Sequence, residues 1–379
     1  MGISGDVFDL DRAFSGPQLP AHLYIHVPFC RTKCSYCDFY STDEVSDINV
    51  EMVIRGIEAE IVRWHNAGLP GVLETVYLGG GTPTVITAGA VRLVRTALDR
   101  FPLRAGAEVT IEANPDSVTA LLMEALAASG VTRVSLGVQS FAPTELAMLG
   151  RVHTVPEAIS AARIIRASGF DLSVDLMCGI PGQTNASWTG SLEQALATGA
   201  QHISVYPLTL EEGTPLQVAC DSGLVATPDP DAAADMMEIA EQLLGVRGLP
   251  RYEVANYAVP GHEARHNVAY WTGRSYMACG PAAHSMLDAE TAYAVGMLTQ
   301  ADLDVGVARV RSAAPADMEL WLTSGEMTTE TLDAEEVARE DVMLGLRLTR
   351  GVSVAEVTRA RLDDVMTDLS RLGLVERFS

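Results

Sequence analysis

Between residues 22 and 208 the sequence alternates six short runs rich in β-branched and aromatic residues with longer amphipathic segments. The runs predict strands at residues 22–29, 75–81, 108–114, 133–139, 171–180 and 202–208. The segments between them predict helices at residues 50–67, 87–100, 119–129, 156–167 and 186–198. Strands joined through crossover helices pair in parallel. The pattern therefore predicts an α/β fold, and both a partial barrel and a doubly wound sheet satisfy it.

Polar and glycine residues gather where these predicted strands end, at residues 79–82, 112–114, 139–140 and 179–181. The first cysteine of a cluster, Cys30, also follows directly after the first strand. Barrels and open α/β sheets both build their sites at the carboxyl ends of parallel strands. We therefore expect these residues to meet at one rim.

After residue 215 the alternation loosens. A helix is predicted at residues 231–246 and a further strand at residues 252–258. Helices at 335–348 and 361–372 indicate a separate small domain, and "LSRLGLVERF" is typical of a winged-helix corner with a helix, a glycine stop and a short strand.

The composition excludes several classes of protein. A formal net charge of −23 argues against general nucleic-acid binding, which needs a basic surface. Six cysteines in 379 residues do not make a disulfide scaffold, so we expect a reducing, cytoplasmic compartment. We also expect no transmembrane helix and no secretory signal, because no long apolar run and no basic flank with an apolar segment occur.

Cys30, Cys34 and Cys37 lie within eight residues, with spacings of four and three. Three thiolates on one loop can hold three irons of a four-iron cluster and leave the fourth iron open to a small molecule. The alternatives are a zinc site, to which His26 could contribute, and ordinary buried thiols. For the scattered Cys178, Cys220 and Cys279, buried free thiols are the expected state.

Several further motifs follow the cysteines in a fixed order. They are "YLGGGTPT" from Tyr77, "IEANP" from Ile111, "RVSLGVQSF" from Arg133, "LGRVHT" from Leu149 and "RHNVAYW" from Arg265. With "CRTKCSYC", they resemble the radical S-adenosylmethionine (SAM) superfamily. Within it they resemble the oxygen-independent coproporphyrinogen III oxidase-like group, and most closely its haem chaperone branch (HemW). The resemblance covers roughly residues 21–284 and is weaker toward the C-terminus.

The resemblance implies a partial (β/α)6 radical SAM barrel with a small C-terminal helical, winged-helix-like domain. The boundaries we expect are an N-terminal segment at residues 1–20 and the barrel at 21–225. A barrel extension with the HNxxYW motif is expected at 226–300, and the helical domain at 301–379.

The resemblance also implies the site. Cys30, Cys34 and Cys37 would ligate a [4Fe–4S] cluster whose open iron binds SAM, and the reduced cluster would cleave SAM to methionine and a 5′-deoxyadenosyl radical. The SAM contacts implied in this way are Tyr24, Tyr36, Gly80, Gly81, Thr82, Glu112, Gln139, Arg151 and Asp175. Glycines at a strand end allow the backbone to approach a ligand, because no Cβ stands in the way. Glu112 could bind the ammonium of SAM or could be a solvated charge at a strand end.

Three features separate oxidase from chaperone. The oxidases carry a fourth cysteine two residues after the third, where this chain has Phe39, and they have a longer N-terminal segment. "HNVAYW" matches the chaperone signature. His266 is then the first candidate for a haem ligand, with Tyr270 and Trp271 stacking on the porphyrin, although a purely structural corner is an alternative. The other candidate histidines are His22, His153, His202, His262 and His284.

The predicted function is a haem chaperone that delivers haem to membrane-bound respiratory proteins and carries a SAM-binding cluster. No residue is assigned a catalytic role, and a homodimer is possible. The alternatives are an enzyme that decarboxylates coproporphyrinogen III oxidatively and a structural metal protein.

Overall fold

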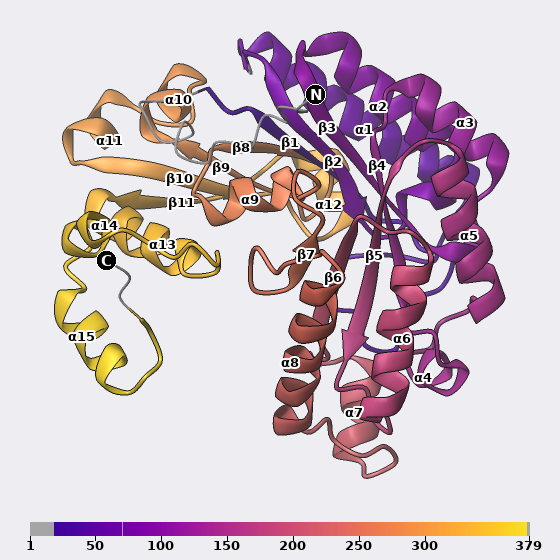
Figure 1. The fold of residues 1–379 in the computed structure, drawn as a ribbon. Coiled ribbons are helices and arrows are strands. Elements are labelled where there is room, and N and C mark those ends of the chain that lie inside the picture. Colours follow the sequence, from indigo (N-terminus) through magenta and orange to yellow (C-terminus); the bar gives the residue numbers. More distant parts are fainter. Residues whose placement is uncertain (1–18, 70, 377–379) are drawn as a thin grey trace, which may run out of the picture.

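The computed structural model describes residues 19–69 and 71–376, and Figure 1 shows their arrangement. The centre is a set of parallel strands. These strands are β1 (His22–Val27), β2 (Leu73–Gly80), β3 (Leu103–Ala113), β4 (Arg133–Gln139), β5 (Asp171–Cys178) and β6 (His202–Pro207). Each contains most of one predicted strand. Of the predicted N-terminal segment 1–20, residues 1–18 lie outside the described residues.

Helices occupy the connections between these strands. The longer ones are α1 (Asp47–Asn66), α2 (Ala88–Arg100), α3 (Ala120–Ser129), α5 (Val155–Ala167) and α6 (Asn185–Ala197), and all start and end within three residues of the predicted bounds. Side-chain caps explain some of these starts. Ser46 accepts a hydrogen bond from the backbone N–H of Asn49 at the start of α1, and Thr154 forms a capping box with Glu157 at the start of α5.

The order of the sheet decides between the two architectures. Strands β1 to β6 are neighbours in sequence order and are all parallel. A doubly wound sheet reverses its direction of growth at a switch point, and no such reversal occurs among these six strands. When each new strand is added on the same side of the previous one, right-handed crossovers place all the connecting helices on one face of the sheet. In Figure 1 these helices lie along the outer side of the curved sheet. The partial (β/α)6 barrel is therefore confirmed.

The two faces of the barrel strands carry different side chains. Outward-facing residues such as Leu23, Val76 and Ile111 are buried in the main hydrophobic core beneath the helices. Most inward-facing side chains are polar or ionisable, Met177 being an exception. They include Tyr77, Thr110, Glu112, Arg133, Ser135, Ser173, Asp175, His202 and Ser204. The strands thus bury their apolar residues outward and enclose a polar interior.

The sheet continues at both edges of the barrel. β7 (Asn256–Ala258) pairs antiparallel with β6, and β8 (Tyr276–Cys279) pairs parallel with β1. Beyond β8 follow β9 (His284–Asp288), β10 (Val307–Ala313) and β11 (Thr328–Asp333), so that eleven strands form one sheet in the described part of the chain. The strand predicted at residues 252–258 is shorter, because the chain bends at residues 254 and 255.

The remaining helices lie around these strands. They are α4 (Pro143–Met148), α7 (Pro215–Asp221), α8 (Pro230–Val246), α9 (Arg265–Trp271), α10 (Ala289–Ala294), α11 (Gln300–Asp304) and α12 (Met318–Ser324). Within residues 19–69 and 71–376, none of the helices is long and apolar enough to cross a membrane.

The C-terminal segment contains α13 (Ala334–Gly345), α14 (Val354–Arg359) and α15 (Asp363–Arg371). The segment 301–379 that was expected to be helical also supplies β10 and β11 to the main sheet. Arg309 of β10 binds Glu340 of α13 at 2.9 Å, which joins the helices to that sheet. Residues 374–376 form no strand, and the rest of the expected winged-helix strand lies outside the described residues.

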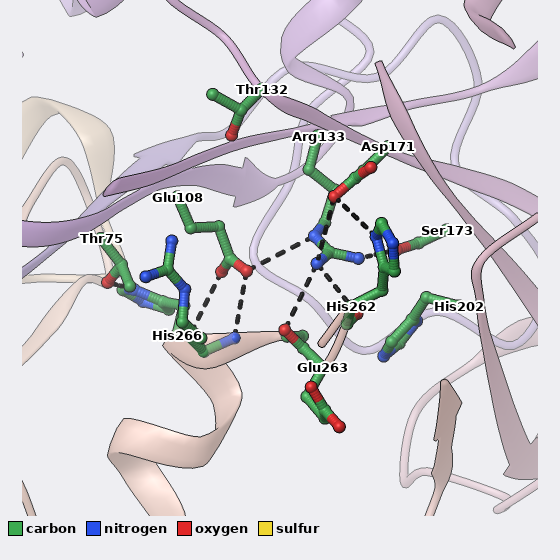
Figure 2. Close-up of polar contacts among 12 residues, drawn as sticks. Thr75, Glu108, Thr132, Arg133, Asp171, Ser173, His202, His262, Glu263 and His266 are labelled. Atoms are coloured by element: carbon green, nitrogen blue, oxygen red, sulfur yellow. Dashed lines mark hydrogen bonds and ion pairs between the residues drawn. The ribbon is translucent and has the colours of Figure 1, made fainter. Parts of the chain in front are cut away.

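Helix α9 lies against the N-terminal ends of the barrel strands. Glu108 of β3 accepts hydrogen bonds from the backbone N–H groups of Arg265 and His266, both at 3.1 Å (Figure 2). A carboxylate at the start of a helix satisfies N–H groups that lack partners within the helix. Glu108 therefore fixes α9 to the barrel.

Arg133 of β4 lies beside Glu108 at the N-terminal ends of the barrel strands, and we call this end, with α9 packed on it, the floor of the barrel. Its Nε lies 3.4 Å from Oε2 of Glu108, and its Nη2 donates to the carbonyl oxygens of His262 at 2.9 Å and Glu263 at 3.3 Å (Figure 2). Both charged side chains are at most 5% exposed. The buried pair thus binds the loop before α9 as well as α9 itself.

Arg133→Met should lower the free energy of unfolding by about 3–5 kcal/mol, because it leaves Glu108 charged, buried and unpaired. Arg371→Met is a matched control, since the Arg371–Asp368 pair is exposed and should contribute at most about 1 kcal/mol. Chemical denaturation of both variants measures the difference. Equal stability of the two variants would contradict the role assigned to the floor.

Candidate functional site

A cavity of about 490 Å³ opens at the C-terminal ends of the barrel strands and reaches down to Arg133 and His202 at the floor. All three clustered cysteines line it, as do residues of β2 to β6. Of the predicted SAM contacts, those at its wall are Tyr36, Gly80, Gly81, Thr82, Glu112, Gln139, Arg151 and Asp175. The expected convergence on one rim is thus observed. Tyr24 and His266 are not part of the wall.

The cysteine loop is held by backbone hydrogen bonds on both sides. The N–H of Cys30 bonds to the carbonyl of Thr42 at 2.9 Å. The backbone of Ser35 bonds to Leu149 at 3.2 Å and to Leu216 at 2.8 Å. These contacts come from segments far apart in the chain, so the completed barrel shapes the loop.

The thiols of Cys30, Cys34 and Cys37 are free and partly exposed. Among the residues that the structure describes, no three His, Cys, Asp or Glu side chains converge as the ligands of a single ion would. Ligands of a cluster bind different irons and lie further apart than ligands of one ion. Three thiols spread along the wall of a cavity therefore fit a cluster.

Arg151 connects the cysteine loop to the strand ends. Its Nη1 donates to Sγ of Cys34 at 3.3 Å, and its Nη2 donates to Oδ1 of Asn114 at 2.6 Å and to the carbonyl of Gly137 at 2.5 Å. A guanidinium beside a thiolate stabilises its negative charge. Its Nε is buried without a partner. Arg151 therefore suits a site that holds anionic sulfur.

The glycines of "GGGT" serve chain packing in addition to any ligand. Gly80 has a φ of +105°, and a methyl group there would lie 2.5 Å from Cε1 of His26. A methyl group at Gly81 would lie 2.6 Å from the carbonyl oxygen of Phe29. The glycines thus allow the end of β2 to pack against β1 and the start of the cysteine loop. Ligand access, which the sequence suggested, is only part of their role.

Two half-buried carboxyl groups line the middle of the cavity. Burial raises the pKa of Glu112 to about 7, although its hydrogen bond from Tyr77 (2.7 Å) lowers it and the charge of Asp175 raises it. Burial likewise raises the pKa of Asp175 to about 6, against the hydrogen bonds from Ser204 and Ser135. A cationic ligand between them would stabilise their ionised forms. The cavity is therefore suited to a positively charged molecule.

Tyr24 and His266 lie behind the wall of the cavity. His266 is 1% exposed, and both ring nitrogens are engaged, Nδ1 with Thr75 at 2.7 Å and Nε2 with the Tyr270 hydroxyl at 2.9 Å. Burial keeps its pKa well below the ordinary value, so the imidazole is neutral. His266 stacks on Tyr77 with ring centroids 5.1 Å apart, and Tyr77 stacks on Tyr24. This arrangement favours the structural alternative for the HNxxYW motif over a haem ligand.

The other end of that motif is half-buried and packed against neighbouring side chains. Trp271 has the guanidinium of Arg347 over its ring at 4.8 Å, and its indole nitrogen is buried. Tyr270 packs edge-on against His266 and Tyr276. Arg347 thus covers a face of Trp271, and Tyr270 is held by edge contacts on two sides. The motif therefore joins the barrel floor to the C-terminal helices.

Sequence reasoning missed Lys33. It lies between two of the clustered cysteines, lines the cavity and is exposed. Of the 26 lysine and arginine residues, it is the only lysine. No ion pair to it occurs within the described residues. A count of lysines alone would have drawn attention to this position. Arg133 and Glu108 carried no comparable signal, because their pairing depends on the sheet register.

Gly80→Ala should destabilise the protein by about 1–3 kcal/mol more than Gly106→Ala. Both positions have a positive φ, but a methyl group at Gly106 meets nothing within 4 Å, whereas at Gly80 it meets His26. Thermal and chemical denaturation of the two variants measure this difference. Equal losses would show that packing against His26 does not require the glycine.

Comparison with known proteins identifies the family of the chain. Residues 24–195 match the radical SAM superfamily. The chain is 34% identical over 363 residues to a protein of Mycobacterium tuberculosis named "Heme chaperone HemW", covering 93% of this chain and 88% of that protein. The Bacillus subtilis protein of the same name is 32% identical over 367 residues, with 93% and 92% covered.

Among solved structures, coproporphyrinogen III oxidase (HemN) from Escherichia coli has a similar fold, with a TM-score of 0.75 and 20% identity. The similarity covers 94% of this chain and 84% of HemN, and at this identity it concerns the fold alone. The sequence relatives identify the branch: the chain belongs to the HemW family of radical SAM proteins.

Proposed function

We propose that this protein is a haem chaperone, which binds haem and hands it to haem-dependent respiratory proteins of the membrane. The main support is its similarity to proteins named heme chaperone over most of its length. The exposed ring of Phe39, where the oxidases of the resemblance have a cysteine, is consistent with this choice. The acceptor proteins, a homodimer and a cytoplasmic location stay predictions.

We further propose that Cys30, Cys34 and Cys37 hold the [4Fe–4S] cluster that radical SAM membership implies. When bound, such a cluster supplies the electron for reductive cleavage of SAM. The residues of this chain would hold and shield it. Arg151 stabilises the anionic sulfur of Cys34, and the backbone contacts of Ser35 fix the loop.

The carboxyl pair supports a SAM position in the middle of the cavity. SAM carries a cationic sulfonium and an ammonium, and Glu112 and Asp175 are acids on the wall of the cavity, with Glu112 beside Gly80. The backbone N–H of Gly80 donates to Oε2 of Glu112 at 3.1 Å, so the glycine segment also orients this carboxylate. Tyr36, Gln139 and Thr82 would contact the rest of SAM.

SAM affinity should weaken about tenfold between pH 8 and pH 6. Without ligand, Glu112 has a pKa of about 7, and bound cation would lower that pKa. SAM binding therefore needs the ionised carboxylate of Glu112. Affinity is strongest above pH 7 and falls as the pH is lowered, and binding releases the proton of Glu112. Calorimetry in buffers of different ionisation enthalpy measures both effects. Glu112→Gln should bind SAM more weakly and lose most of this pH dependence, keeping only the part below pH 7 that Asp175 contributes. An unchanged profile in that variant would refute the assignment.

A single preparation distinguishes chaperone from oxidase. Protein reconstituted anaerobically to about four irons per chain should bind haem saturably, seen as a Soret shift. The same preparation, given SAM and a reductant, should not convert coproporphyrinogen III to protoporphyrinogen IX over multiple turnovers. HemN, which has a similar fold, serves as the positive control for the assay. Multiple turnovers by this protein would overturn the chaperone proposal in favour of the oxidase.

A further inference from the structure

We propose that His284 is the protein ligand of the haem iron. This inference rests on the proposed function and identifies the residue by which the cargo is held. An imidazole can bind iron only if one of its nitrogens is accessible and free of a stronger partner. The chain has eight histidines, and all of them lie in the described residues. Their environments can therefore be compared one by one.

Three histidines form part of the barrel interior and are unavailable. His22 bonds through Nδ1 to Thr75 at 2.9 Å, and His26 bonds through Nδ1 to the Tyr24 hydroxyl and through Nε2 to the carbonyl of Tyr40. His266 has both nitrogens engaged, as described above. All three are at most 7% exposed. Iron binding at any of them would require the barrel to open.

Three more histidines are buried or already paired. His153 is 3% and His202 is 2% exposed, so neither ring can reach a porphyrin outside the protein. His262 lies at the barrel floor, where its Nδ1 is 3.1 Å from the carboxylate of Asp171 and its side chain is 33% exposed. This hydrogen bond would compete with iron.

Two exposed histidines, His65 and His284, remain. His65 lies in the last turn of α1 and packs on Phe101, with ring centroids 5.9 Å apart. Because α1 ends shortly before β2 begins, His65 lies at the edge of the barrel opposite the cysteines. It is therefore far from the site mouth.

His284 lies at the same end of the barrel strands as the cysteines, outside the wall of the cavity. It is the first residue of β9 and follows the turn after β8, whose end lies beside the end of β1 because the two strands are parallel neighbours. The turn packs tightly on β1, since a methyl group at Gly280 would be 2.3 Å from the carbonyl oxygen of His26. Burial lowers the pKa of His26, the hydrogen bond to Tyr40 raises it, and nearby His284 lowers it further. His284 is thus adjacent to the strand that leads into the cysteine loop.

The same end of the barrel carries side chains that suit a porphyrin. Phe39 is 70% exposed and belongs to the segment that continues the cysteine loop toward α1, and Ile48 in the first turn of α1 is 73% exposed. Haem is a flat apolar disc with two propionates, which suits apolar side chains and a cation. Lys33 on the cysteine loop supplies the cation at the cavity rim. An iron ligand, two exposed apolar side chains and a positive charge therefore belong to segments at the C-terminal end of the barrel strands in an acidic protein.

Titration of the full chain with ferric haem tests the assignment. His284→Gly should weaken haem binding at least tenfold and change the Soret and EPR spectra of the bound iron. Added imidazole should restore the wild-type spectrum, because it can occupy the space left by the missing ring. His65→Gly, the matched exposed control, should bind haem as the wild type does.

The outcomes separate this inference from the proposed function. Saturable binding by the wild type with unchanged affinity and spectra in His284→Gly would overturn the ligand assignment and leave the chaperone proposal standing. A His284→Gly defect that imidazole does not restore, together with a lower melting temperature, would also overturn it, because the loss would then reflect folding. Absence of saturable binding by the wild type would overturn the proposed function itself, and the ligand assignment with it.

Discussion

The inward faces of the six parallel strands are polar, and this interior has to be satisfied by hydrogen bonds and paired charges. An unpaired buried charge costs several kcal/mol, so each inward ionisable group needs a partner. Glu108 meets this requirement at the floor through Arg133 and the start of α9. Higher in the barrel, Glu112 and Asp175 meet it only in part, through Tyr77 and Ser135. A positive charge placed between these two acids would complete their pairing.

The floor and the mouth of the barrel consequently have different tasks. At the floor, two charged residues with opposite signs neutralise each other and bind the loop and helix that carry the HNxxYW motif. At the mouth, three thiols, Arg151 and Lys33 remain accessible from the cavity. The motif that resembles a haem signature therefore lies on the side of the barrel where the chain is closed and packed. The accessible chemistry lies on the opposite side.

Much of the barrel could be predicted from sequence, because each strand is a short β-branched run and each helix has an amphipathic period. The convergence of Cys30, Gly80 and Glu112 also followed from their positions after strands. The parallel order of β1 to β6, which excludes a doubly wound sheet, could not be derived from periodicity, since both architectures share it. The predicted length of β7 was too great, because no glycine or proline marks the bend after Glu253 in the sequence. The sequence could not show that both ring nitrogens of His266 are engaged. They bond to Thr75 and Tyr270, and the fold brings Thr75 next to the histidine.

The single lysine at the mouth gives the protein an unusual chemical property. Lys33 is the only side chain with a primary amine, and it is exposed beside the three thiols. Reagents that acylate amines would therefore modify one side chain, Lys33, in addition to the chain terminus. That side chain lies on the rim of the cavity. A fluorophore attached there would report on whatever occupies the mouth without any engineered residue. The same property makes a lysine-directed cross-linker a selective means of trapping an acceptor protein that docks at this edge.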